Sequence, residues 1–283
     1  MLGFVWLMLL AYAGLVFPAS SQDHNNSNNN KKNIFILAGQ SNMSGRGGIN
    51  NLTWDGVVPP QCQPNPAILR LSSELKWVQA SEPLHKDIDV NVTCGVGPGM
   101  VFANTVLHKK DSSIRGVVGL VPCAVGGTKG TKISEWGRGT YLYNQLLRRA
   151  SAALQDGGGS IQAVLWYQGE SDTVNLQDAA LYKGRLERFF MDLRADLQSP
   201  LLPIIQVALA SGQGPYIEKV REAQLGIHLA HVKCVDAKGL QLEPDHLHLT
   251  TQAEVQLGKM LADAFLHTLP TPLQSNAPKT SHN

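Results

Sequence analysis

Residues 33–45 read NIFILAGQSNMSG, and this stretch decides how the rest of the chain is interpreted. The apolar run Ile34–Ala38 has the length and the branched side chains of a strand buried on both faces of a sheet. Ser41 would then follow the carboxyl end of that strand, where open α/β sheets place their chemistry. A helix beginning at residue 42 would put Ser41 beside backbone N–H groups that can stabilise an oxyanion. A helix cap fits the same pattern, so this stretch alone does not establish a nucleophile.

Four further apolar runs follow, and segments with helical periodicity separate them. Strands are expected at Ile34–Ala38, Val117–Val121, Ala163–Tyr167, Pro203–Leu209 and Val232–Asp236. Helices are expected at Met100–Leu107, Tyr141–Leu154, Ala180–Leu197, Tyr216–His231 and Thr250–Leu269. This alternation predicts an α/β fold with a five-stranded parallel sheet and helices on both faces. Residues 46–98 are rich in Gly, Pro, Asn and Ser, which predicts a long functional loop with a short hairpin at 67–78.

The composition and the amino terminus indicate the class of protein. The chain has 283 residues, 43% of them hydrophobic, and a formal charge of +2, which suits one α/β domain. Such a charge gives no electrostatic reason to expect nucleic acid or an anionic membrane as partner. Residues 2–17 are almost wholly apolar but shorter than the roughly 20 residues of a spanning helix. We therefore expect a signal peptide at 1–21, a flexible linker at 22–32, the domain at 33–270 and a disordered tail at 271–283.

If the protein is secreted, its Asn-x-Ser/Thr sequons are potential N-glycosylation sites. Glycans are expected on Asn25, Asn51 and Asn91, each in polar loop sequence. A fourth sequon at Asn42 overlaps the opening motif, and we expect it to stay unmodified because a glycan there would block the site. The mature protein is expected to be a secreted monomer without a membrane anchor.

Four cysteines allow three disulfide pairings. Cys62 and Cys94 lie in polar loop sequence and form the preferred pair. Cys123 and Cys234 lie in or beside apolar runs, where a free cysteine is often a small buried side chain. No pair has C-x-x-C spacing, so we expect no metal site.

Three polar or glycine-rich segments follow predicted strands at the edge where Ser41 lies. In the Gly126-Gly127 turn, adjacent glycines can present a backbone N–H to a ligand, although a plain turn fits equally. In the second segment Gln168 can offer a side-chain amide to the cleft, while Glu170 and Asp172 can orient the site or bind hydroxyls. A helix start in which Ser171 or Asp172 is the cap is the alternative for this segment.

The third segment is Asp245-x-x-His248, before the last predicted helix. Residues three apart lie on one face of a helical turn, so Asp245 can hold Nδ1 of His248 and leave Nε2 for Ser41. His246 would point elsewhere. A capped helix start also explains this segment. Together, however, the segments supply a nucleophile, oxyanion donors and a base with its acid, the three components of hydroxyl attack on a carbonyl.

These four motifs, taken in order over residues 33–269, resemble the sialate O-acetylesterase-like domain of the SGNH-hydrolase superfamily, and in particular plant probable carbohydrate esterases. The resemblance implies a flavodoxin-like three-layer α/β/α sandwich and a serine esterase without metal or other cofactor. It implies Ser41 as nucleophile, His248 as base and Asp245 as its partner. The oxyanion hole would use the N–H of Ser41, a glycine of the Gly126-Gly127 turn (Gly127 by preference), and the Gln168 amide.

One departure from the superfamily concerns the last donor, because the chain has Gln168-Gly169-Glu170 where the superfamily has Gly-x-Asn. The expected function is release of O-acetyl groups from a carbohydrate of the cell wall or apoplast, through an acyl-Ser41 intermediate. The alternatives are a non-catalytic carbohydrate-binding protein on the same fold and a lipid or small-ester hydrolase. Polar side chains expected around the cleft favour a sugar, and we assign substrate binding to Gln40, Asn42 and Glu170.

Overall fold

The computed structural model describes residues 31–109, 112, 114–128, 130–155 and 158–269. The expected signal peptide, the tail, Asn25 and most of the linker lie outside these ranges. Within the described residues, no helix is long and apolar enough to cross a membrane.

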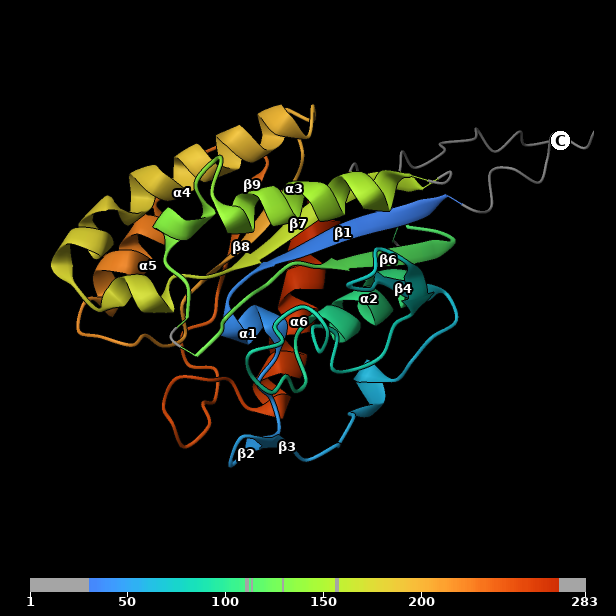
Figure 1. Cartoon of the computed structure of the whole chain (residues 1–283), viewed down its shortest axis with the longest axis horizontal. Helices are drawn as coiled ribbons and strands as arrows, with labels where there is room; N and C mark the ends of the chain where they lie inside the picture. Colours follow the sequence, from blue (N-terminus) through green and yellow to red (C-terminus); the bar gives the residue numbers. More distant parts are fainter. Residues whose placement is uncertain (1–30, 110–111, 113, 129, 156–157, 270–283) are drawn as a thin grey trace, which may run out of the picture.

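A seven-stranded sheet forms the centre of the molecule (Figure 1). Its strands are β1 (Lys32–Gly39), β4 (Ile68–Leu71), β5 (Trp77–Gln79), β6 (Val117–Pro122), β7 (Gly159–Tyr167), β8 (Ile204–Ala208) and β9 (Val232–Asp236). They lie in the order β5-β4-β6-β1-β7-β8-β9, and every neighbouring pair is parallel except β4 with β5. The five predicted parallel strands are confirmed as β6-β1-β7-β8-β9.

The strand count differs from the prediction because the hairpin at 67–78 joins the sheet. The hairpin itself is confirmed as β4 and β5, and β4 pairs with β6 from Ile68 to Arg70. Four residues of β4 are too few to show from sequence which strand they pair with. A second, separate hairpin consists of β2 (Ile49–Asn50) and β3 (Thr53–Trp54), within the segment expected to be loop.

Helices cover both faces of the sheet, as expected for three layers. In Figure 1, α3 (Tyr141–Leu154) and α4 (Leu176–Asp196) lie above the sheet, while α2 (Gly99–His108) and α6 (Thr251–Leu266) lie below it. The remaining long helix, α5 (Ile217–Leu225), packs against α4. It ends at Leu225, before the predicted His231, and the N–H of Gly226 caps its last turn. The short elements are α1 (Ser41–Ser44) and the 3₁₀ turns η2 (Pro60–Cys62), η3 (Ile133–Trp136) and η4 (Glu170–Thr173).

Strand β1 is held rigidly in the core because it lies between β6 and β7. Its Phe35 ring meets Phe102 of α2 and Phe265 of α6 edge to face, with centroids 4.9 and 5.0 Å away. The strand ends at Gly39, where φ is +133° and a Cβ would lie 2.0 Å from the Tyr167 carbonyl oxygen. Only glycine fits this close approach, and it brings the chain to Ser41 beside the end of β7.

Candidate active site

Ser41, His248 and Asp245 form a continuous chain of hydrogen-bonded side chains. Ser41 begins α1 just past β1, and its Oγ lies 3.0 Å from Nε2 of His248. Nδ1 of His248 lies 2.6 Å from Oδ2 of Asp245, and Oδ1 of Asp245 accepts the backbone N–H groups of Leu247 and His248. The carboxylate therefore orients the imidazole and, through the same two N–H groups, the loop that carries it. This is the arrangement expected from the sequence.

The protonation states of this chain suit proton transfer from Ser41. Burial lowers the pKa of His248; Asp245 opposes this effect and the nearby charge of Arg46 adds to it. Burial would raise the pKa of Asp245, but the backbone N–H groups of His248 and Leu247, and then the imidazole, lower it. At neutral pH the imidazole is therefore neutral and can accept a proton, while Asp245 is ionised.

Asn42 fixes the distance between the nucleophile and the base. Its Oδ1 accepts the N–H of Leu249 at 3.0 Å, and its Nδ2 donates to Oε1 of Glu170 at 2.8 Å and to the carbonyl of Leu247 at 3.4 Å. The residue after Ser41 is thereby bonded to residues on both sides of His248. Asn42 is fully buried, so it cannot carry a glycan in the folded protein.

Asp89 and Arg46 are functional-site residues that the motifs did not reveal. Asp89 is buried, and its carboxylate accepts four hydrogen bonds: from Nη2 of Arg46 at 2.6 Å, Oγ of Ser44 at 2.9 Å, and the N–H groups of Gly126 and Gly127 at 3.1 and 3.0 Å. Burial would raise the pKa of Asp89, but the Arg46 charge and these donors lower it. The only sequence signal for them was the length of the 46–98 segment.

The groups expected as oxyanion donors in the Gly126-Gly127 turn and at Gln168 have other hydrogen-bond partners in this structure. Both glycine N–H groups are engaged by Asp89, so the turn is braced by a carboxylate instead of presenting free donors to the cleft. Gln168 is also placed otherwise: its Nε2 donates to the carbonyl of Thr131 at 2.6 Å and to Asp172 at 2.7 Å, and the side chain is fully buried. The prediction that Gln168 points into the cleft is therefore wrong in this structure, because a buried amide satisfies its N–H groups internally.

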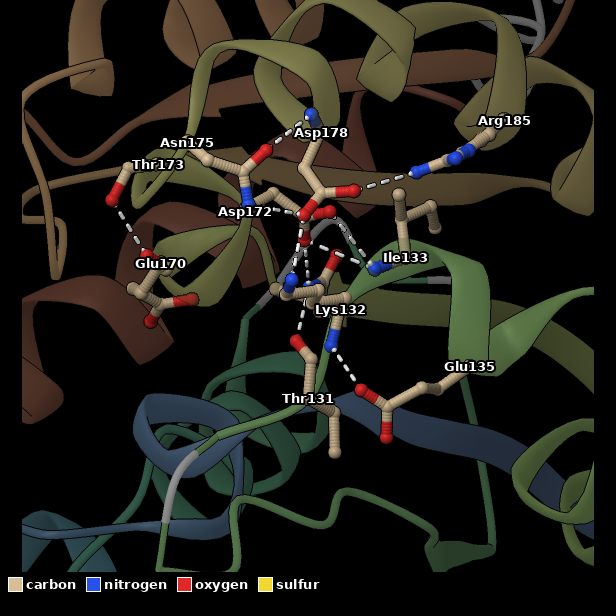
Figure 2. A network of polar contacts seen from close by, with 11 residues as sticks. Thr131, Lys132, Ile133, Glu135, Glu170, Asp172, Thr173, Asn175, Asp178 and Arg185 are labelled. Atoms are coloured by element: carbon tan, nitrogen blue, oxygen red, sulfur yellow. Dashed lines mark hydrogen bonds and ion pairs between the residues drawn. The ribbon is translucent and has the colours of Figure 1, made fainter.

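Figure 2 shows the polar network to which this part of the chain belongs; its Asp172 is buried, whereas its Lys132 and Arg185 are partly exposed. Asp172 accepts the N–H of Ile133 at 3.0 Å in addition to Gln168, and Asp178 binds Lys132 at 2.6 Å and Arg185 at 3.1 Å. Burial raises the pKa of Asp172 to about 7 against the hydrogen bonds of Gln168 and Ile133. The network joins η3 to η4 and α4, so its role is architectural.

The predicted substrate-binding residues do not reach the cleft. Gln40, Asn42 and Glu170 are each 0% exposed. Gln40 accepts hydrogen bonds from Gln168 and the Gly169 N–H, and burial raises the pKa of Glu170 to about 7. These side chains form a second layer behind Ser41, and the prediction that they contact substrate is wrong in this structure.

A cleft of about 380 Å³ opens above Ser41 and His248. The 46–98 segment supplies much of its wall, as expected for a long functional loop, through Arg46, Ile49, Leu52, Val92 and Thr93. Its volume is within the range of small-molecule sites. Among the described residues, no group of three His, Cys, Asp or Glu side chains is arranged to hold a metal ion.

The predicted Cys62–Cys94 disulfide is absent. All four cysteines are free thiols, and Cys62, Cys94 and Cys123 are buried. Burial raises the pKa of both Cys94 and Cys123 to about 11, so these thiols stay protonated and behave as small apolar side chains. Of the expected glycosylation sites in the described part of the chain, Asn51 and Asn91 are exposed.

Comparison with known proteins shows the family of the chain. A family model described as carbohydrate esterase, sialic acid-specific acetylesterase, matches residues 31–267. The chain belongs to this carbohydrate esterase family. A probable carbohydrate esterase of Arabidopsis thaliana is 56% identical to this esterase over 239 residues, which cover 82% of this chain and 90% of the relative.

Solved structures show the same fold for the esterase. An X-ray structure of an Arabidopsis thaliana protein has a TM-score of 0.79 and 53% identity, and the match covers 85% of this chain and 100% of that chain. A carbohydrate acetylesterase from Xanthomonas citri has a TM-score of 0.58 at 20% identity, over 84% of this chain and 57% of that chain. At that identity the likeness concerns the fold alone.

Proposed function

We propose that this esterase is a secreted serine enzyme that hydrolyses O-acetyl esters of a carbohydrate. The observation that carries the proposal is the Ser41–His248–Asp245 chain, with contacts of 3.0 and 2.6 Å, at the floor of an open cleft. The family, and the printed names of its relatives, support a carbohydrate ester as substrate. The apolar amino terminus supports secretion.

In the proposed mechanism, His248 takes the proton of Ser41 as Oγ attacks the acetyl carbonyl. The tetrahedral intermediate collapses when the imidazolium protonates the departing sugar oxygen, which leaves acetyl-Ser41. Water, deprotonated by His248, then attacks this ester, and acetate leaves as Ser41 regains its proton. Asp245 holds the imidazole in one orientation and stabilises its charged form.

The oxyanion of each intermediate requires donors that Gly127 and Gln168 do not supply in this arrangement. The N–H of Ser41, at the start of α1, is one proposed donor. The other is Arg46, which lines the cleft and is only 5% exposed. Its Nη2 donates one N–H to Asp89 at 2.6 Å and carries a second N–H, whereas each glycine amide has a single N–H that Asp89 already accepts. A Cβ added to Gly126 would lie 2.8 Å from Cβ of Ser41 and 2.9 Å from Nη2 of Arg46, so the guanidinium lies beside the nucleophile. Its charge suits an anionic intermediate.

The test is acetate release by the wild type and by Ser41→Ala. The variant is expected to lose release from acetylated xylan, pectin or sialic acid and from p-nitrophenyl acetate, with an unchanged circular dichroism spectrum. Retained activity in Ser41→Ala would exclude the acyl-serine mechanism. Labelling of Ser41 by a fluorophosphonate distinguishes an enzyme from a non-catalytic binding protein. The relative rates of hydrolysis of acetylated sugars and lipid esters identify the substrate class.

A further inference from the structure

Tyr141, the first residue of α3, has the most exposed aromatic side chain in the described part of the chain. Its side chain is 74% exposed, whereas every other described Phe, Trp or Tyr is buried or partly buried. An exposed tyrosine ring gains little from burial on folding, and such rings are common where a protein contacts a partly apolar ligand.

Tyr141 lies at the rim of a second cavity of about 310 Å³. The face of α3 that carries Tyr141 also carries Gln145 and Arg148, one and two turns further on, and both line the same cavity. Asn91 and Asp87 line it from the loop opposite. The cavity therefore combines one aromatic ring with amide, guanidinium and carboxylate groups.

The second cavity adjoins the catalytic cleft. Asn91 lines the second cavity and the next residue, Val92, lines the catalytic cleft. On the other side, Val125 lines the second cavity and Gly127 the cleft. The two spaces share no lining residue, so residues 91–92 and the turn at 125–127 form the boundary between them. A chain of linked sugars with one residue over Ser41 would reach the second cavity by crossing this boundary.

The chemistry of the cavity matches a pyranose ring. The C–H face of a sugar is apolar and packs on an aromatic ring, while its hydroxyl groups both donate and accept hydrogen bonds. Asp87 is held in place by Arg70 at 2.6 Å and by the N–H of Ser73 at 2.9 Å, and Arg148 donates to Gln145 at 3.2 Å. Polar groups fixed in this way can orient a ligand without first being ordered.

We infer that the second cavity is a subsite for another sugar residue of the same chain as the acetylated one, with Tyr141 as its stacking platform. The inference rests on the proposed function and deepens it: the substrate is a polysaccharide or oligosaccharide and not a free acetylated sugar. A glycan on Asn91 would fill the same space, so the subsite and that expected modification exclude each other.

The experiment compares Tyr141→Ala with the wild type, both carrying Asn91→Gln so that no glycan interferes. Acetate release is measured on whichever of acetylated xylan and acetylated pectin the wild type hydrolyses faster, on an acetylated monosaccharide and on p-nitrophenyl acetate. Tyr141→Ala is expected to raise KM for the polymer about three- to tenfold and to leave both small esters unchanged. Tyr141→Phe, which keeps the ring, is expected to behave as the wild type.

Leu154→Ala is the matched control, because Leu154 is an exposed residue at the other end of α3 that lines neither cavity. An unchanged KM for the polymer, or an equal rise for polymer and small esters, would overturn the subsite. Hydrolysis of acetylated monosaccharides but of no polymer would also overturn the subsite and leave the esterase intact. Failure on every acetylated sugar, with p-nitrophenyl acetate still cleaved, would instead overturn the proposed carbohydrate substrate.

Discussion

Two polar regions lie at the same edge of the sheet, and their surroundings differ. The catalytic region holds Ser41, His248 and Asp245 at the wall of a cleft, and the side chain of Asp245 is 49% exposed. The second region follows β7, and its Gln168 and Asp172 are fully buried. Both contain amides, carboxylates and glycines after a strand. Because the catalytic region is open to solvent, substrate can reach it. The region after β7 is closed to solvent, so its polar groups join structural elements.

The carboxyl groups of the two regions have pKa values displaced in opposite directions. Burial would raise both, but in the catalytic region N–H donors and the imidazole lower the pKa of Asp245. In the region after β7, burial prevails and raises the pKa of Asp172 to about 7. Removing each carboxyl group should therefore have separate effects, on activity in one region and on stability in the other.

The largest expected effect is on catalysis, from Asp245→Asn. The substitution keeps Oδ1 for the backbone N–H groups but removes the acceptor of His248 Nδ1, so the imidazole loses its orienting partner. The corresponding change in a serine protease triad costs about 10⁴ in kcat, and we expect a loss of about 10³–10⁴. The free energy of unfolding should change by less than about 1 kcal/mol because Asp245 is half exposed. Steady-state kinetics and urea unfolding measure the two quantities.

The opposite pattern is expected for Asp172→Ala. The substitution leaves the Ile133 N–H without its acceptor, and an unpaired buried donor costs about 1–3 kcal/mol. It also removes one acceptor of Gln168 Nε2, which keeps the Thr131 carbonyl, and the loss of such a hydrogen bond costs about 1 kcal/mol. We expect the free energy of unfolding to fall by about 2–4 kcal/mol and kcat of the folded fraction to stay within a few-fold. Asp172→Asn, which keeps one acceptor, should lose less. A large fall in kcat without a loss of stability would show that the network takes part in catalysis.

The same contrast shows what could be predicted from the sequence. The apolar runs and their spacing were sufficient to predict the parallel sheet, and the ends of its strands located Ser41, Asp245 and His248. Strand ends indicate an edge of the sheet but not the direction of a side chain, so Gln168 was assigned to the cleft although it bonds to Asp172 and Thr131. Asp89 could not be predicted because its partners Arg46, Ser44 and the Gly126-Gly127 turn come together only in the folded chain.

A smaller effect concerns the pH dependence of the catalytic region. The Arg46 charge lowers the pKa of His248, because a second positive charge nearby disfavours imidazolium. The paired change Arg46→Gln with Asp89→Asn removes both charges and leaves no unpaired buried ion. Because Arg46 is also the proposed oxyanion donor, kcat should fall by about 10²–10³ as well, so only the pH at which the acid limb lies is compared. The pKa of His248 should then rise. Since His248 acts as a base only when neutral, the acid limb of the kcat/KM profile should move to higher pH.

The control for this shift is a partly exposed ion pair of the network in Figure 2. Lys132→Gln with Asp178→Asn also removes a bonded pair of opposite charges, but neither residue is among the groups that shift the pKa of His248. Its acid limb should coincide with that of the wild type. Equal displacement of the two profiles would mean that the shift reflects loosened structure and not the charge of Arg46.

The smallest expected effect concerns backbone strain, which is present in the wall of the catalytic cleft and differs from that of the segment after β7. Asn51 and Leu52 at the tip of the β2–β3 hairpin have φ of 47° and 62°, and Leu52 lines the cleft while 85% exposed. In the buried segment 168–173, the only positive φ is at Gly169. A left-handed leucine is unfavourable by about 1–2 kcal/mol, and glycine recovers part of this at an entropic cost. Leu52→Gly should therefore raise the free energy of unfolding by about 0.5–1 kcal/mol.

Leu201→Gly provides the control for strain, because Leu201 is 63% exposed but is not among the residues with positive φ. There glycine only adds freedom to the unfolded chain, so urea unfolding should show a loss of stability. If Leu52→Gly also destabilises the protein, leucine at the hairpin tip is held by packing and not strained. If Leu52→Gly stabilises the protein and raises KM for the acetylated substrate, Leu52 is both strained and in contact with substrate. The segment 168–173 has no such strained side chain.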